Sequence, residues 1–164
     1  MSHIDLIRAA AERLNGHAVR TPLMNSPFLD EIAGRRVYVK AECLQHTGSF
    51  KYRGGRSAVS ALDPGTRAKG VLAFSSGNHA QGVARAAAEF DVPSVIIMPN
   101  DAPQLKIDHT LAPAPEVILH DRPNGDSREA LAEQIQAARG MTLTQTYDAQ
   151  QVILSQGICR VELS

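Results

Sequence analysis

The chain has 164 residues, 43% hydrophobic and 21% charged, which is enough for one compact domain with a core and too short for two of ordinary size. Lysine plus arginine equals aspartate plus glutamate at 17 each, so no field of one sign attracts nucleic acid or a membrane surface. There is no membrane-spanning apolar run or apolar signal core, and Cys43 and Cys159 fit neither a disulfide framework nor a metal site, so a reducing cytoplasm is the expected location.

The first third of the chain predicts a helix, an extended segment and a short strand. Apolar residues recur at the three- and four-residue steps of a buried helical face at Ile4, Ile7, Ala11 and Leu14. Asn15-Gly16 then ends the helix, because glycine tolerates the left-handed conformation of many helix ends. Residues 21–27 contain Thr-Pro and Ser-Pro steps, which favour an extended, turning backbone. Residues 37–41 alternate β-branched and aromatic side chains, which predicts a strand.

From residue 49 onward, strands and helices alternate. The predicted strands are residues 70–75, 92–98, 117–120 and 141–145. The predicted helices are 49–62 with Ser49 as its cap, 79–90, one opened by a capping box at 101–104, and one opened by a capping box at 126–129 and ended by Gly140. Strands apolar enough to be covered on both faces predict an α/β fold with an open parallel four-stranded sheet and flanking helices.

The first segment that could form a binding site is Ser75-Ser76-Gly77-Asn78-His79, which joins a predicted strand to a predicted helix. In open parallel sheets, ligands bind beyond the carboxyl ends of the strands. Backbone N–H groups and the positive end of a helix dipole meet there, which favours a small carboxylate or phosphate. An ordinary Ser/Asn-rich helix-capping turn fits the same five residues.

The second segment is residues 47–55, with Lys51 in the first turn of a predicted helix. The helix dipole repels a cation at that position, and a partly desolvated cationic site favours the neutral amine that forms a Schiff base. Phe50 can supply an apolar wall beside that amine. A solvated surface lysine next to a core aromatic residue fits the same pattern.

Taken in order, these segments resemble the fold-type II pyridoxal-phosphate (PLP) enzymes, and within them the threonine/serine dehydratase and serine racemase branch. The matching strings are KAECLQ at 40–45, TGSFKYRG at 47–54 and SSGNHAQG at 75–82. The resemblance covers roughly residues 15–157. It implies that residues 49–146 form the small domain of the tryptophan synthase β-like fold, and that residues 1–48 and 147–164 belong to the large domain.

The resemblance also implies roles for individual residues. Lys51 would hold PLP covalently and move the α-proton of the substrate, and Ser76 would work opposite it in racemase members. Phe50 would pack near the cofactor ring, and Asn78 would hydrogen-bond its 3-hydroxyl. The carboxylate of an amino-acid substrate would be held by Ser75, Ser76, Gly77, Asn78 and His79. The implied activity is β-elimination from L-threonine or L-serine to a 2-oxo acid and ammonia.

No metal site is expected. The remaining histidines have no metal-like helical spacing and are predicted to be surface or capping residues: His3, His17, His46, His109 and His120.

Several features depart from the family pattern. The chain is about half the family's length and has no tetraglycine loop for the PLP phosphate, which predicts weakened cofactor binding. Pro113 and Pro115 would end the preceding helix early. Alternatives therefore stay open: a truncated, weak or inactive fragment, an oligomer or a chain paired with a full-length relative, a racemase or β-replacement enzyme, and a carboxylate-binding module without catalysis.

Overall fold

A parallel four-stranded sheet lies at the centre of the computed structural model, which describes residues 3–114, 116–122, 125, 127–145 and 149–163. Its strands run in the order β5-β4-β3-β6, and each hydrogen-bonded pair is parallel. They are β3 (Val71–Phe74), β4 (Ser94–Pro99), β5 (Glu116–His120) and β6 (Thr142–Leu143). The predicted α/β fold with an open parallel sheet is confirmed.

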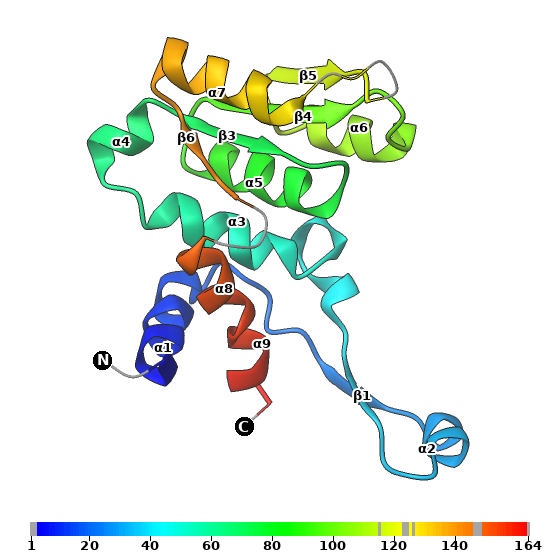
Figure 1. The fold of residues 1–164 in the computed structure, drawn as a ribbon. Helices are drawn as coiled ribbons and strands as arrows, with labels where there is room; N and C mark the ends of the chain where they lie inside the picture. Colours follow the sequence, from blue (N-terminus) through cyan, green and yellow to red (C-terminus); the bar gives the residue numbers. More distant parts are fainter. Residues whose placement is uncertain (1–2, 115, 123–124, 126, 146–148, 164) are drawn as a thin grey trace.

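Helices cover both faces of this sheet (Figure 1). Side chains on β3 alternate between the faces, so Val71 and Ala73 join one core and Leu72 joins the other. The first core lies under α3 (Lys51–Ser60), α5 (Asn78–Glu89) and α6 (Gln104–Leu111), whereas the second lies under α7 (Arg128–Arg139). The sheet is therefore buried between two helical layers, as its apolar strands predict.

The two ends of the chain form a helical layer on the far side of α3 (Figure 1). The layer contains α1 (His3–Leu14), α8 (Gln150–Gln156) and α9 (Ile158–Val161). Its core is made by Ala10, Leu14, Leu154 and Ile158. Helix α3 therefore has one face toward α5 and another toward α8, and seven of its ten residues are buried.

A small arm projects from the rest of the molecule (Figure 1). It consists of β1 (Leu23–Asn25), α2 (Pro27–Ala33) and β2 (Tyr38–Lys40), and its two strands pair antiparallel. The sequence predicts the strand near 37–41 but not its partner or α2. The side chains of Phe28 and Ile32 are 78% and 84% exposed, so the arm presents apolar surface to solvent.

The predicted helix caps are corrected in three places. Ser49 does not cap α3, because the helix begins after Phe50 and the Ser49 hydroxyl is buried without a partner. Residues 101–104 form no capping box, since α6 starts at Gln104 and the Asp101 carboxylate accepts hydrogen bonds from Arg122 instead. Ser127 caps α7 by accepting from the amide of Ala130 at 3.1 Å, and Asp126 lies outside the described residues.

Short helices complete the connections. The 3₁₀ turns η1 (Glu42–Leu44) and η2 (His46–Gly48) lead into α3, and α4 (Pro64–Ala68) connects α3 to β3. The end of α6 at Leu111 agrees with the early stop that Pro113 predicts, while Pro115 lies outside the described residues.

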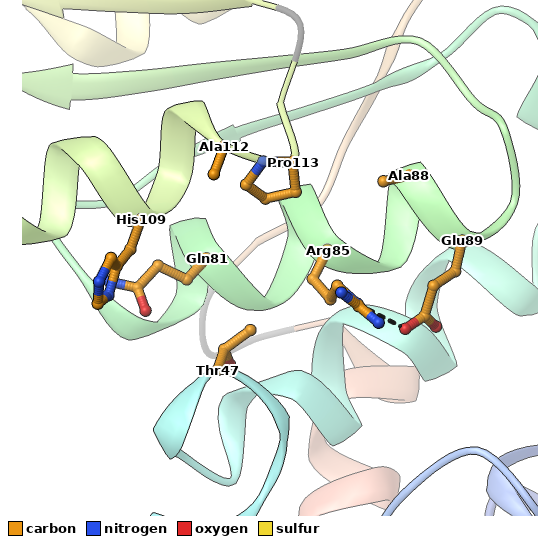
Figure 2. Close-up of a pocket in the computed structure, with 8 residues that line it drawn as sticks. All are labelled: Thr47, Gln81, Arg85, Ala88, Glu89, His109, Ala112 and Pro113. Atoms are coloured by element: carbon orange, nitrogen blue, oxygen red, sulfur yellow. Dashed lines mark hydrogen bonds and ion pairs between the residues drawn. The ribbon is translucent and has the colours of Figure 1, made fainter.

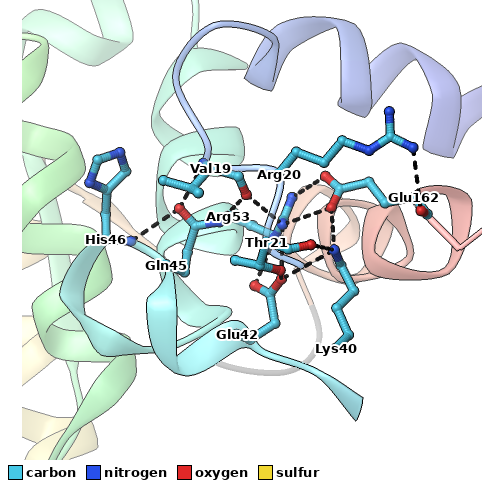
Figure 3. A network of polar contacts seen from close by, with 9 residues as sticks. All are labelled: Val19, Arg20, Thr21, Lys40, Glu42, Gln45, His46, Arg53 and Glu162. Carbon is cyan, nitrogen blue, oxygen red and sulfur yellow. Dashed lines mark hydrogen bonds and ion pairs between the residues drawn. The ribbon is translucent and has the colours of Figure 1, made fainter. Parts of the chain in front are cut away.

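A buried ionic network fixes α3 against both ends of the chain (Figure 3). The guanidinium of Arg53, a fully buried residue, donates to both carboxylate oxygens of Glu42 at 2.9 Å, to Glu162 at 2.7 and 3.1 Å, and to the carbonyl of Val19 at 3.0 Å. Lys40 adds a second cation, 2.6 Å from Glu162. Two cations and two carboxylates therefore balance one another beside the start of α3.

The Glu42 carboxylate makes the stability of this network depend on pH. Burial alone would raise the pKa of Glu42, but hydrogen bonds from Arg53 and Thr21 and the charges of Arg53 and Lys40 hold it below its usual value of about 4.3. A carboxylate whose pKa is lower in the folded state than in the unfolded state stabilises the fold fully at pH values above its unfolded-state pKa. This contribution is lost as pH falls through the lower, folded-state pKa.

We expect the unfolding free energy of the wild type to fall as pH decreases from about 5 to about 3, and to fall less steeply in Glu42→Gln. Urea titrations followed by circular dichroism at several pH values measure both slopes. Equal slopes would contradict a role for Glu42 in this pH dependence.

Candidate active site

The turn before α3 places Lys51 at the first position of that helix. Thr47 has φ 60° and ψ 14°, and Gly48 follows with φ 68°, so two successive residues are left-handed. A β-branched residue in this conformation is strained and has to be held there by its surroundings. The hydroxyls of Thr47 and Ser49 are both buried without a hydrogen-bond partner.

Lys51 is half-buried beside an aromatic ring. Its ammonium lies 5.2 Å from the ring centroid of Phe50, which is itself 38% exposed. Burial lowers the pKa of the Lys51 amine, because desolvation disfavours its charged form. A lowered pKa is what a reactive amine requires, and its cause here is burial.

The five residues from Ser75 to His79, called here the 75–79 turn, follow the carboxyl end of β3. The amide of Ser75 continues the sheet by donating to Ile97 at 3.0 Å, and the amide of Gly77 donates to the Ser75 hydroxyl at 3.2 Å. Gly77 precedes α5, and no side chain caps this helix. The first amides of α5 are therefore available to an anion, and the exposed side chains of Ser76 and Asn78 flank them.

His79 anchors the turn from inside. Its Nε2 lies 3.1 Å from the carbonyl of Thr144, and its Nδ1 is buried without a partner. Burial lowers the pKa of His79, the nearby charge of Lys51 lowers it further, and the bond to Thr144 opposes both. The imidazole is therefore neutral at physiological pH and donates from Nε2 to the carbonyl.

Two glycines bring the lysine segment and the 75–79 turn together. A Cβ atom on Gly55 would lie 2.5 Å from the carbonyl oxygen of Gly82, and one on Gly82 would lie 2.7 Å from the carbonyl oxygen of Lys51. The backbones of α3 and α5 are thus in direct contact one turn beyond the 75–79 turn. This contact sets the position of the Lys51 backbone relative to the start of α5.

Lys106 is a further residue of the site, to which the sequence assigned no role. It lies in the first turn of α6, and a Cβ atom on Gly77 would approach its ammonium to 3.0 Å. No local signal in the sequence singles out Lys106, because Asp101 and Asp108 lie close to it in the chain, and only the fold brings it to Gly77.

The other histidines and the cysteines form no second centre. His46 packs edge-on against Tyr52, at 4.8 Å between ring centroids. His120 is buried at the last position of β5, so its prediction as a surface or capping residue is wrong. Within the described residues no three His, Cys, Asp or Glu side chains could jointly hold a metal, and none of the helices has the length and apolar character to cross a membrane.

A separate open pocket of about 590 Å³ lies beside the site (Figure 2). Its lining comes from η2, α5 and α6 and from the segment after α6: Thr47, Gln81, Arg85, Ala88, Glu89, His109, Ala112 and Pro113. Arg85 and Glu89 form an ion pair at 2.8 Å along its wall. The residues of the 75–79 turn and Lys51 are not part of this lining, so the pocket is distinct from the predicted site.

Comparison with known proteins identifies the family. A family model described as "Pyridoxal-phosphate dependent enzyme" matches residues 14–164. The chain belongs to this family of pyridoxal-phosphate-dependent enzymes. The resemblance inferred from the three motifs is thereby confirmed, and so is the family's cofactor.

Relatives in this pyridoxal-phosphate family include ammonia-lyases and racemases. The chain is 46% identical over 162 residues to an L-threo-3-hydroxyaspartate ammonia-lyase from Pseudomonas sp, covering 99% of this chain and 50% of that protein. It is 39% identical over 159 residues to a serine racemase from Schizosaccharomyces pombe, covering 97% of this chain and 49% of that protein. The chain thus spans about half the length of the curated relatives it matches.

Solved structures of the family agree with the fold. Maize serine racemase matches with a TM-score of 0.93 at 36% identity, covering 98% of this chain and 48% of that chain. A serine racemase from Dictyostelium discoideum matches with a TM-score of 0.90 at 33% identity, covering 98% of this chain and 52% of that chain. The matched proteins include ammonia-lyases for hydroxyaspartate and serine racemases, so they do not single out the threonine or serine elimination expected from the sequence.

The residues present fit the family's cofactor. A half-buried amine with a lowered pKa stands next to an aromatic ring at Lys51 and Phe50. The Nδ1 atom of His79, whose ring is close enough to feel the charge of Lys51, is buried without a partner, as are the hydroxyls of Thr47 and Ser49 in the turn that precedes the lysine. Buried polar atoms are normally hydrogen-bonded, so this set is consistent with a polar ligand beside Lys51.

Proposed function

We propose that this chain carries the lysine-bearing half of a pyridoxal-phosphate-dependent ammonia-lyase for β-hydroxy amino acids. The observation that supports this most directly is the backbone contact of α3 with α5, which sets Lys51 beside the uncapped start of α5. An amine of lowered pKa and an anion cradle are thereby combined in one place. Pyridoxal phosphate, when bound, supplies an electron sink for the negative charge that develops on Cα.

The residues of the chain have separate tasks in this proposal. The Lys51 amine would hold the cofactor until the amino group of the substrate displaces it, and the released amine would then accept the Cα proton, for which its lowered pKa keeps a neutral fraction available. Phe50 packs near the cofactor ring, and the Asn78 amide binds its 3-hydroxyl. The 75–79 turn holds the substrate carboxylate through backbone N–H groups, with the Ser75 hydroxyl bracing Gly77.

The proposed reaction removes the Cα proton and the Cβ hydroxyl group. Cleavage of these two bonds forms a Cα–Cβ double bond, and hydrolysis of the resulting enamine gives a 2-oxo acid and ammonia. Serine, threonine and 3-hydroxyaspartate all carry the required hydroxyl group. The relatives whose names specify hydroxyaspartate, at 46% and 41% identity, extend the substrate class beyond the serine and threonine expected from the sequence.

Racemisation is the second candidate function. Ser76 is exposed at the start of α5 and can return a proton to the opposite face of Cα. The serine racemase relatives support this alternative. Chiral analysis of a serine reaction separates the two, since elimination yields pyruvate whereas racemisation yields D-serine.

The domain division is part of the same proposal. Residues 49–146 would form the small domain, and residues 1–48 and 147–164 would form part of a larger one. The remaining portion, supplied by the same or another polypeptide or by an oligomer, would cover the exposed arm that carries Phe28 and Ile32. The free thiols of Cys43 and Cys159 fit a reducing cytoplasm.

Covalent trapping tests the proposal. The intact chain is incubated with pyridoxal phosphate at pH 7, reduced with borohydride and digested for mass spectrometry. We expect about one equivalent of label at Lys51, because its lowered pKa makes it more nucleophilic at that pH than an ordinary solvated lysine. Lys51→Ala should abolish the label, and Lys69→Ala, at the exposed end of α4, should retain it. Label spread over several lysines, or none, would contradict the proposal.

A further inference from the structure

The turn that ends α1 contains an exposed Asn-Gly step at Asn15 and Gly16. Gly16 has φ 73°, and a Cβ atom added to it would meet no atom within 4 Å. The peptide bond between the two residues is therefore open to solvent, and no packing contact restricts the glycine.

The backbone amides of this turn differ in their hydrogen bonding. The amide of Asn15 donates to the carbonyl of Glu12 at 3.2 Å, and the amide of His17 donates to the carbonyl of Leu14 at 3.0 Å. Between them, the amide of Gly16 forms no hydrogen bond within the part of the chain that the structure describes. Its nitrogen is therefore free to react.

An exposed asparagine followed by glycine has the atoms needed to lose its side-chain amide without an enzyme. The backbone nitrogen of Gly16 attacks Cγ of Asn15 and bonds to it, and Nδ2 leaves as ammonia after taking up the proton released by the attacking nitrogen. Glycine has no Cβ to hinder this attack. Water then opens the cyclic imide. Opening at Cγ gives an aspartate, and opening at the main-chain carbonyl gives an isoaspartate, whose backbone is one methylene longer.

The chain leads from this turn directly into the buried ionic network around Arg53. Only residues 16–18 separate Asn15 from Val19. The carbonyl of Val19 accepts from Arg53 at 3.0 Å and from Gln45 at 2.8 Å (Figure 3). Leu14, on the other side of the turn, is buried in the core shared with α8 and α9. An extra methylene between these two anchors strains the turn or moves one of them.

The charge of the product acts in two opposing directions. A carboxylate at position 15 lies at the negative end of the α1 dipole and one turn after Glu12, and both disfavour it. Arg20 attracts it, because Arg20 and Asn15 line the same cavity of about 240 Å³. Since exposed charge pairs contribute less than about 1 kcal/mol, the longer backbone of the isoaspartate is the larger perturbation.

We propose that Asn15 deamidates spontaneously in the folded protein, and that the isoaspartate product loosens the attachment of α1 to α3 and its network. The fold itself leaves this position open to modification, because it exposes the side chain and gives the next amide no acceptor. The inference does not depend on the proposed function, since neither Lys51 nor the 75–79 turn takes part in it.

Peptide mapping of the intact chain tests the modification. The chain is aged at pH 7 in heavy-oxygen water, with and without urea, and then digested with trypsin in ordinary water. Heavy oxygen enters the new carboxylate, so only deamidation during ageing is counted. We expect uptake in peptide 14–20 of the folded chain to proceed within about threefold of the rate in urea, because no hydrogen bond of the Gly16 amide has to break first. Protection by the fold of more than about tenfold would overturn the inference.

Two controls identify the source of the label. Asn15→Gln should abolish uptake in peptide 14–20, because the larger ring forms far more slowly, and uptake that persisted in this variant would contradict the proposal. Asn25 is held by the fold, since its side-chain amide donates to the Asp30 carboxylate at 3.0 Å and to the Val37 carbonyl at 2.9 Å. Its uptake should therefore be slower in the folded chain than in urea.

Urea denaturation tests the structural consequence. The deamidated fraction of the aged chain is separated by ion exchange, and its isoaspartate content is measured by enzymatic methylation. We expect this fraction to unfold at a lower urea midpoint than Asn15→Asp, which has the same charge on an unmodified backbone and should stay close to the wild type. Equal midpoints for the isoaspartate-containing fraction and Asn15→Asp would refute the loosening of α1.

Discussion

Replacement of Arg53 by methionine is expected to lower the free energy of unfolding by about 3–5 kcal/mol, the usual cost of breaking a buried ion pair from one side. Arg53 is fully buried and donates to Glu42, Glu162 and the Val19 carbonyl (Figure 3). Methionine fills much of the same volume but leaves two partly buried carboxylates, with side chains 13% and 16% exposed, and only Lys40 to balance them. Urea denaturation at pH 7 measures the loss.

Arg139→Met is the matched control for this prediction. Arg139 also makes a bidentate pair, with Glu116 at 2.6 and 3.0 Å, but its side chain is 47% exposed. Exposed pairs contribute less than about 1 kcal/mol. If Arg53→Met and Arg139→Met lowered the free energy of unfolding equally, burial would not explain the cost of removing Arg53. The triple variant with Glu42→Gln and Glu162→Gln should recover part of the loss, because it removes the unbalanced charges.

The sequence predicts the sheet well because each strand carries its own signal. Residues 70–75 and 92–98 are apolar runs bounded by turns, and the structure places β3 within the first and β4 over most of the second. The pairing of β1 with β2 was not predicted, since that pairing depends on contacts between distant segments. Helix caps were the least predictable detail: Asp101 binds an arginine 21 residues away, which a local capping pattern does not reveal.

The candidate site was predictable where the chemistry lies in contiguous residues. The place of Lys51 at the start of a helix and that of the 75–79 turn between a strand and a helix both follow from the local sequence, and the structure brings the two segments together, whereas the roles of their residues stay predictions. Lys106 and the partners of Arg53 were missed because they depend on tertiary packing: Lys106 reaches Gly77 from another helix, and Glu162 reaches Arg53 across 109 residues. The sequence shows which residue is unusual at its position, whereas only the fold shows which other residues that side chain contacts.

Gly82→Ala is expected to destabilise the protein by about 1–3 kcal/mol and to weaken labelling of Lys51 by pyridoxal phosphate. Alanine normally stabilises a helix by about 1 kcal/mol relative to glycine. Here the added Cβ would lie 2.7 Å from the carbonyl oxygen of Lys51 and 3.1 Å from the amide nitrogen of Tyr52, and backbone atoms cannot swing aside as a flexible side chain can. The helices α3 and α5 have to separate, which moves the lysine away from the 75–79 turn.

Gly65→Ala in α4 isolates this steric cause from the general effect of replacing glycine in a helix. Its Cβ would meet nothing closer than a carboxylate oxygen of Asp63 at 3.4 Å, an ordinary contact. That variant should equal or slightly exceed the wild type in stability and keep the Lys51 label. If Gly82→Ala behaved in the same way, direct backbone contact between α3 and α5 would not be what positions Lys51. If it lost labelling at unchanged stability, the contact would serve the site more than the fold.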